Sequence, residues 1–269
     1  IWTDLSTVIV PAPSNVGWFS DRFAGRTFYD FDKDGDNDLI VTDINFGQFG
    51  DNVPIDILYF KNNNGVFQKD ISVFGGNIPK YVHGRQIILG DYDKNGWMDV
   101  VIIGHGWDKE PFPGEKQKIL LNNNGVFTTK ELPIPNVQNN TRLPFTHSGT
   151  SGDVDNDGDL DIFMTNNMGI NGIFLINDGS GNFTYNSTVF PSIEHKPYFT
   201  SNMYDLNADG YLDLVIAGHD QDMHLTAANG AKPAILWGSF DGKFSLSRIT
   251  YLPVVSKNGV SNSINFIDY

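Results

Sequence analysis

Short apolar runs alternate with acidic or Asn/Gly-rich turns along almost the whole chain. The runs are too short for helices, and no stretch keeps a helical apolar period, so the pattern predicts β-strands throughout. Asn-Gly and Asp-Gly turns between apolar runs are a strong signal for β-hairpins. The sequence therefore predicts an all-β protein made of short antiparallel strands.

One acidic segment occurs four times, with starts at residues 30, 91, 153 and 205 that are 61, 62 and 52 residues apart. The copies read DFDKDGDNDLIV, DYDKNGWMDVVI, DVDNDGDLDIFM and DLNADGYLDLVI. After each copy comes a second signature, an apolar run, a turn and an aromatic residue, at 57–67, 119–127, 173–183 and 235–244. Each repeat thus predicts four strands: one before the acidic loop, one after it, and a hairpin.

Repeats of four strands are typical of the blades of a β-propeller. A β-solenoid is the rival interpretation, but its coils are shorter, at roughly 20–30 residues each. We expect a single propeller region over 1–269, with blades at about 24–80, 81–142, 143–196 and 197–258. Residues 1–12 and 259–269 resemble single strands of incomplete blades, so we expect a fragment of a larger ring and of a longer chain.

Charge and composition narrow the possible partners. The chain has 18 Lys+Arg against 32 Asp+Glu and a formal net charge of −14. This charge disfavours nucleic acid and anionic membrane surfaces, which need a basic face. No apolar run is long enough to insert into a membrane, and the absence of cysteine excludes disulfides and thiolate metal sites.

The four acidic segments have the spacing of a calcium loop. Counted from the first Asp, oxygen-bearing side chains occupy positions 1, 3, 5 and 9, with Gly at position 6. Ca²⁺ takes six to eight hard oxygen ligands, and alternate residues of a tightly turned loop supply them. The predicted ligands are Asp30, Asp32, Asp34 and Asp38; Asp91, Asp93, Asn95 and Asp99; Asp153, Asp155, Asp157 and Asp161; and Asp205, Asn207, Asp209 and Asp213.

Position 7 varies in side chain, which suits a ligand contributed by the main chain. Its predicted carbonyl ligands belong to Asp36, Trp97, Asp159 and Tyr211. An EF-hand would need a bidentate Glu at position 12, but that position holds Val41, Ile102, Met164 or Ile216. Four solvated turns without metal are the remaining alternative. They are disfavoured because fourteen carboxylates at these positions repel one another, whereas four Ca²⁺ would bring the formal charge from −14 to −6.

These motifs and their spacing resemble the FG-GAP/VCBS repeat family, the blades of integrin α-chain propellers and of many bacterial surface proteins. The resemblance implies one structural Ca²⁺ per complete blade, about four in all, and a seven-bladed ring. It also implies a secreted, cell-surface or periplasmic location, and the lack of cysteine favours a bacterial source. The Phe-Gly and Gly-Ala-Pro signatures are poorly kept here, so integrin-like ligand recognition is not implied.

Candidate ligand-binding residues follow the second strand of two repeats. His105 and His219 both stand fourteen residues after the first Asp, and Trp107 lies in the insertion after His105. These residues are expected either to bind a ligand or to close a strand. Phe46, Phe49 and Phe112 are further candidates for stacking on sugar rings, and His83, Arg85, His147, Arg142 and Tyr81 are expected near the axis of the ring.

Two functions remain open from the sequence. The first is a non-catalytic binding or adhesion module for a protein or glycan partner. The alternative is a carbohydrate-active enzyme, such as a polysaccharide lyase, on the same scaffold. No G-x-S-x-G, P-loop or H-E-x-x-H motif is present.

Overall fold

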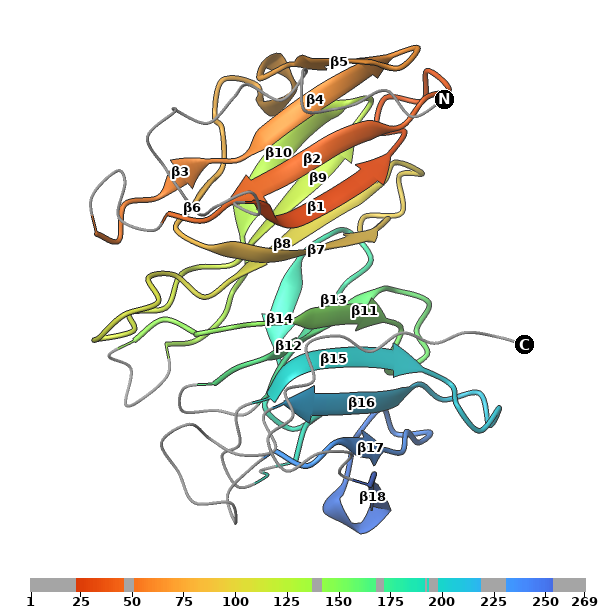
Figure 1. Ribbon diagram of the computed structural model, residues 1–269. Coiled ribbons are helices and arrows are strands. Elements are labelled where there is room, and N and C mark those ends of the chain that lie inside the picture. Colours follow the sequence, from red (N-terminus) through yellow and green to blue (C-terminus); the bar gives the residue numbers. More distant parts are fainter. Residues whose placement is uncertain are drawn as a thin grey trace.

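A computed structural model describes residues 23–45, 51–136, 142–167, 172–191, 193, 198–218 and 231–253. The predicted all-β fold is confirmed: these residues form four four-stranded antiparallel sheets (Figure 1). The predicted partial blades at 1–12 and 259–269 lie outside the described residues.

Within each sheet the strands follow one another in chain order, and each predicted repeat range holds one sheet, save that the first sheet begins at Phe23. The first contains β1 (Phe23–Tyr29), β2 (Asp38–Asp43), β4 (Leu58–Asn63) and β5 (Val66–Lys69). The second contains β7 (Gly84–Gly90), β8 (Asp99–Gly104), β9 (Lys118–Asn123) and β10 (Val126–Glu131). The third contains β11 (Gly149–Gly152), β12 (Asp161–Thr165), β13 (Gly172–Asn177) and β14 (Phe183–Tyr185). The fourth contains β15 (Tyr198–Tyr204), β16 (Asp213–Gly218), β17 (Ala234–Leu236) and β18 (Ile249–Tyr251).

The remaining elements are small. β3 (Ile55–Asp56) pairs with β6 (Lys80–Tyr81), and the 3₁₀ helices η2 (Ser72–Phe74) and η4 (Leu246–Arg248) have three residues each. No helix among the described residues has the length and apolar character needed to cross a membrane.

The first strands of the four sheets lie side by side. β1 contacts β7, β7 contacts β11, and β11 contacts β15. The Gly149 amide on β11 donates to Gln86 Oε1 on β7 at 2.8 Å, and the Thr42 hydroxyl on the neighbouring second strand β2 donates to the Gly84 carbonyl on β7 at 2.6 Å. This arrangement is the one that blades adopt around a propeller axis.

The core lies between neighbouring sheets rather than within one. Side chains alternate along a strand, so Val100 and Ile102 of β8 face the first sheet while Val101 and Ile103 face the third. Both faces of each second strand are therefore buried, which explains why these strands read as unbroken apolar runs.

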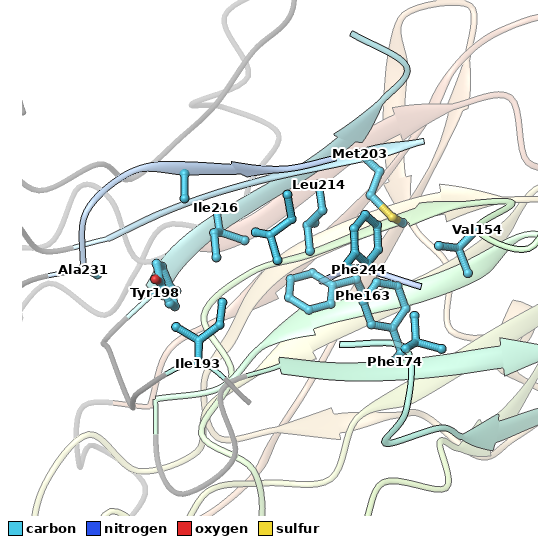
Figure 2. Packing of buried hydrophobic residues seen from close by; sticks show 13 residues of the cluster. Val154, Phe163, Phe174, Ile193, Tyr198, Met203, Leu214, Ile216, Ala231 and Phe244 are labelled. Carbon is cyan, nitrogen blue, oxygen red and sulfur yellow. The ribbon is translucent and has the colours of Figure 1, made fainter. Parts of the chain in front are cut away.

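Figure 2 shows the same packing between the third and fourth sheets, where Phe163 and Phe174 meet Leu214 and Phe244. The Phe174 and Phe244 rings stack with centroids 5.6 Å apart. Each fully buried side chain of this size contributes about 1.5–3 kcal/mol to folding, so the sheets hold one another together.

The connections separate into two ends of the molecule. Figure 1 shows the four turns between first and second strands at one end of the sheets, on the right of the view. The long connection from β8 to β9 projects from the opposite end, on the left. The acidic loops thus share one end, and the β8–β9 connection, which carries His105 and Trp107, extends from the other.

Candidate functional site

Each acidic loop joins the first and second strands of its sheet and closes around its first Asp. In the first loop, Asp30 Oδ1 accepts from the Asp34 amide and Oδ2 from the Gly35 amide, both at 3.0 Å. In the second, Asp91 accepts in the same way from Asn95 at 3.0 Å and Gly96 at 2.9 Å. The pattern recurs at Asp153 and Asp205.

Glycine at position 6 of each loop has a left-handed backbone conformation. Its φ angle is positive in all four loops, between 85° and 103°, a region that L side chains rarely adopt. Position 4 is left-handed as well, although it holds Lys33, Lys94, Asn156 and Ala208. The loops are therefore built alike despite their different side chains.

The Asp at position 9 connects each loop to the hairpin of its own sheet through hydrogen bonds. Asp99 is fully buried; its Oδ2 accepts from the Tyr92 amide in the loop at 2.8 Å, and its Oδ1 accepts from the Asn122 amide on β9 at 2.7 Å. The equivalent carboxylates are also fully buried and make the same pair of bonds; they are Asp38, Asp161 and Asp213.

Three of the loops gather carboxylates tightly enough to hold one cation. In each, oxygens from positions 1, 3 and 9 lie within 4.8 Å of one another; the groups are Asp30, Asp32 and Asp38, then Asp91, Asp93 and Asp99, then Asp153, Asp155 and Asp161. Two ligands on opposite sides of a Ca²⁺ stand about twice 2.3–2.6 Å apart. The spacing is therefore compatible with calcium. In the fourth loop Asn207 replaces the Asp at position 3, within the same loop hydrogen bonds.

Electrostatics favours a cation at these positions. Burial, with a smaller contribution from the neighbouring loop carboxylates, raises the pKa of Asp99 and of Asp161 to about 7. Burial also raises the pKa of Asp38 and Asp213. A carboxylate that is costly to ionise alone gains most from a divalent cation, and the all-oxygen donor set fits hard Ca²⁺. When bound, the ion would neutralise these charges and fix the loop.

The first loop also contacts a lysine. Lys61 on β4 forms ion pairs with Asp32 and, at 3.0 Å, with Asp34. The hydrogen bond from Lys61 lowers the pKa of Asp34. A cation entering this loop would share Asp32 and Asp34 with an ammonium group, whereas the described ion pair of the third loop joins Lys94 to Asp159 at position 7.

Adjacent loops are joined by asparagines that the sequence did not single out. Asn122 Nδ2 donates to the carbonyl of Phe31, in the loop of the preceding sheet, at 2.9 Å. Asn177 Nδ2 donates to the carbonyl of Tyr92 at 2.8 Å. The only available signal was the Asn that precedes each hairpin turn in three repeats, at 62, 122 and 177. In the fourth sheet Gly238 takes this place.

Hairpin turns pack against the preceding loop at the same joint. A methyl group on Gly125 would lie 3.0 Å from Cβ of Asp32, and one on Gly242 would lie 2.9 Å from Cβ of Asp155. Gly181 stands in the same relation to Asp93. Each of the first three acidic loops therefore lies between its own sheet and the hairpin of the next one.

Position 4 also links the loops directly. Lys33 donates to the Gly96 carbonyl at 2.8 Å and lies 4.1 Å from the centre of the Trp97 ring. Lys94 forms an ion pair with Asp159 in the third loop. At position 7, the side chains of Trp97 and Asp159 thus contact the lysine at position 4 of the preceding loop. That the position-7 carbonyls are calcium ligands stays a prediction.

The predicted ligand-binding residues have mixed positions. His105 is fully buried at the end of β8, and Trp107 is only 7 % exposed, which does not favour it as an open platform for sugars. Phe112 is half-buried and packs edge-on against Phe145. Tyr81 is buried, with its hydroxyl donating to the Ile102 carbonyl at 2.8 Å. His219, Phe46 and Phe49 lie outside the described residues.

His105 belongs to a polar cluster with His83 and Arg85. The His83 and His105 rings have centroids 4.0 Å apart, and Arg85 Nη1 is 3.1 Å from His105 Nε2. Burial, with a smaller contribution from Arg85, lowers the pKa of His83 to about 3 and of His105 to about 2. Both imidazoles are therefore neutral at pH 7.

The comparisons with known proteins agree with the repeat pattern. The family model described as FG-GAP-like repeat matches residues 6–102 and 153–216. No curated protein sequence matches the chain. Among solved structures, the V. cholerae biofilm matrix protein Bap1 matches with a TM-score of 0.38 and 13 % identity, over 86 % of this chain and 39 % of that one. This chain thus spans well under half the length of Bap1, and a similarity this weak says nothing about shared ligands. On the extent of the family match, the chain belongs to the FG-GAP-like repeat family.

Proposed function

We propose that this chain is a calcium-stabilised β-propeller module that binds a protein or glycan partner. The observation that carries the proposal is the repetition of one oxygen-lined loop at the joints between successive sheets. Ca²⁺ would hold the loops at one end of the sheets in place. The loops at the opposite end would then be free to differ in sequence and to contact a partner.

The calcium part of the proposal has a direct test. Metal that binds only the folded state stabilises it by mass action, by about 2.7 kcal/mol per site at 100 times Kd. We expect EGTA to lower the melting temperature by several degrees and added Ca²⁺ to restore it, with Mg²⁺ restoring less. An identical melting curve with EGTA and with Ca²⁺ would contradict the structural role.

The location we propose is outside the cytoplasm: secreted, at a cell surface or periplasmic, in a bacterium. Calcium loops of extracellular modules typically bind Ca²⁺ at millimolar concentrations, which are found outside the cytoplasm. Adhesion is the general function that we propose for such a module.

A polysaccharide lyase is the second candidate, and one observation favours it. Arg85 and two neutral histidines meet at the strand ends opposite the acidic loops, a set that could bind an acidic sugar and move a proton. Tyr81 would not serve as its acid, because its hydroxyl is buried and already bonded to a carbonyl.

A paired assay separates the two functions. The chain, loaded with Ca²⁺, is screened on a glycan array and incubated with polyuronates while unsaturated products are followed by absorbance. Glycan binding without turnover supports a lectin-like module, and turnover would refute the non-catalytic proposal. Should both assays be negative, a protein partner is the remaining form of the proposal, to be tested by cross-linking on the surface of the source cells.

A further inference from the structure

Two histidines and an aspartate meet at the end of the second sheet that faces away from the acidic loops. His83 precedes β7 and His105 follows β8, and the His105 amide donates to the His83 carbonyl at 3.3 Å. One ligand atom each from His83, His105 and Asp108 lies within 4.8 Å of the other two. Both histidines are buried and Asp108 is exposed, so the cluster opens to solvent on the side of the carboxylate.

The orientation of His105 suits a metal ligand. Its Nδ1 lies 2.9 Å from the carbonyl oxygen of Gly106, to which an Nδ1–H donates. This bond places the proton on Nδ1 and leaves the lone pair of Nε2 as an acceptor. Metal-binding histidines typically give their other N–H to a backbone carbonyl or a carboxylate in the same way.

A buried carboxylate fixes the two segments that carry the histidines. Glu115 accepts from the amides of Val82 at 2.9 Å and His83 at 3.2 Å, and also from the amide of Gly106 at 2.8 Å. Glu115 thus connects the backbone next to His83 with the backbone next to His105. Ligand residues that are held in place by such hydrogen bonds are preorganised for binding.

We propose that His83, His105 and Asp108 bind a late first-row divalent cation, with Zn²⁺ as the representative ion. Two imidazoles and one carboxylate suit Zn²⁺ and similar ions, whereas the oxygen-only acidic loops suit Ca²⁺. Three protein ligands leave a coordination position open toward solvent. A group of a partner or a water molecule would complete the set, so this site could add metal-dependent recognition to the module.

Arg85 occupies the nitrogen of His105 that a metal ion would bind. Its Nη1 donates to His105 Nε2 at 3.1 Å, the atom that the metal would use. A bound cation would therefore push the guanidinium aside. Because of this competition, removing Arg85 should strengthen metal binding. A general loss of structure would weaken it instead.

The test uses the whole chain in saturating Ca²⁺, so that the acidic loops are not available to Zn²⁺. Zinc is titrated by calorimetry, and Co²⁺ is used as a coloured substitute whose spectrum reports nitrogen ligation. We expect one Zn²⁺ per chain, at least a tenfold loss of affinity in Asp108→Asn, and tighter binding in Arg85→Met. His147→Gln is the matched control, because its ring is 4.9 Å from that of His105 yet it lies outside the proposed ligand group.

Several results would overturn the proposal. They are the absence of stoichiometric zinc binding, an unchanged affinity in Asp108→Asn, equal losses in His147→Gln and Asp108→Asn, and weaker binding in Arg85→Met. Replacing a buried histidine such as His105 could prevent folding. Asp108 is exposed, so Asp108→Asn tests the site without that risk. The result is independent of the calcium proposal, since calcium is constant throughout and is tested separately by chelation.

Discussion

At the scale of single residues, position 9 of each acidic loop has two roles. The carboxylate of Asp99 is a predicted calcium ligand, and its two oxygens also accept main-chain amides from the loop and from β9. Position 3 lacks the second role: among the described residues, the hydrogen bonds to Asp93 come from Asn95 of its own loop and none comes from β9. The two positions should therefore respond differently to the same substitution.

We predict that Asp99→Asn weakens calcium binding and also destabilises the calcium-free protein. The amide would turn an N–H toward a main-chain N–H, and an unsatisfied buried donor costs about 1–3 kcal/mol. Asp93→Asn is the control, because the fourth loop carries Asn207 at this position. It should reduce calcium affinity while leaving the melting temperature without calcium nearly unchanged. Equal melting temperatures for the two calcium-free variants would contradict the anchoring role.

Ala208 is a second residue with a defined expectation. It occupies position 4 with φ of 57°, where the third loop has Asn156 at 59°. Asparagine tolerates the left-handed region better than alanine does. Ala208→Asn should raise the free energy of unfolding by about 0.5–1 kcal/mol, measured by urea denaturation in calcium. A destabilised variant would show that the loop strain is not the deciding factor.

At the scale of elements, the hairpin of one sheet and the acidic loop of the preceding sheet form a joint. Asn122 is its main polar contact: besides the Phe31 carbonyl, its side chain donates to the Met98 carbonyl at 3.2 Å and accepts from the Gly125 amide at 2.9 Å. One side chain thus connects its own turn, its own loop and the neighbouring loop.

Asn122→Ala should therefore cost more than the loss of a surface amide. Several buried main-chain groups would lose their partner, so we expect a destabilisation of about 2–4 kcal/mol. The adjacent and exposed Asn123 provides the control, and its change to Ala should fall within about 0.5 kcal/mol. Thermal denaturation of both variants compares them, and equal shifts would argue against the joint.

The parts of this fold that depend on local sequence could be predicted, and the joints could not. The loop spacing and the hairpin turns lie within a dozen residues, so the acidic loops and the strand pattern were readable. The bond from Asn122 to Phe31 spans 91 residues, and only the packing of two sheets brings the partners together. The burial of Trp107 could not be predicted for a similar reason, because the fold of a long insertion decides it.

At the scale of the whole molecule, the proposed calcium ions would compete with protons for the same carboxylates. Asp99 and Asp161 have a pKa of about 7 in the metal-free fold, against an unperturbed 3.8. As pH falls from 7 toward 4, the metal-free folded state takes up protons that the unfolded chain does not, so these groups make it more stable. Calcium must displace those protons, so its affinity falls over the same range.

The difference in melting temperature between calcium-loaded and calcium-depleted protein should therefore shrink as pH falls from 8 to 5. Depletion by dialysis is preferable to EGTA here, since the chelator itself weakens in acid. Asp99→Asn removes one of the two groups and should flatten the dependence. A difference that stays constant or grows on acidification would mean that these carboxylates do not bind the ion.

The position of the first three acidic loops between two sheets also limits how the chain can be dissected. A piece that ends after β10 retains the contact of Asn122 with Phe31 but removes Asn177, the donor to Tyr92. A single excised sheet would lose contacts on both sides. The smallest excised piece that keeps one acidic loop together with both sheets that contact it is therefore two consecutive sheets. Sub-fragments for expression should be designed with those boundaries.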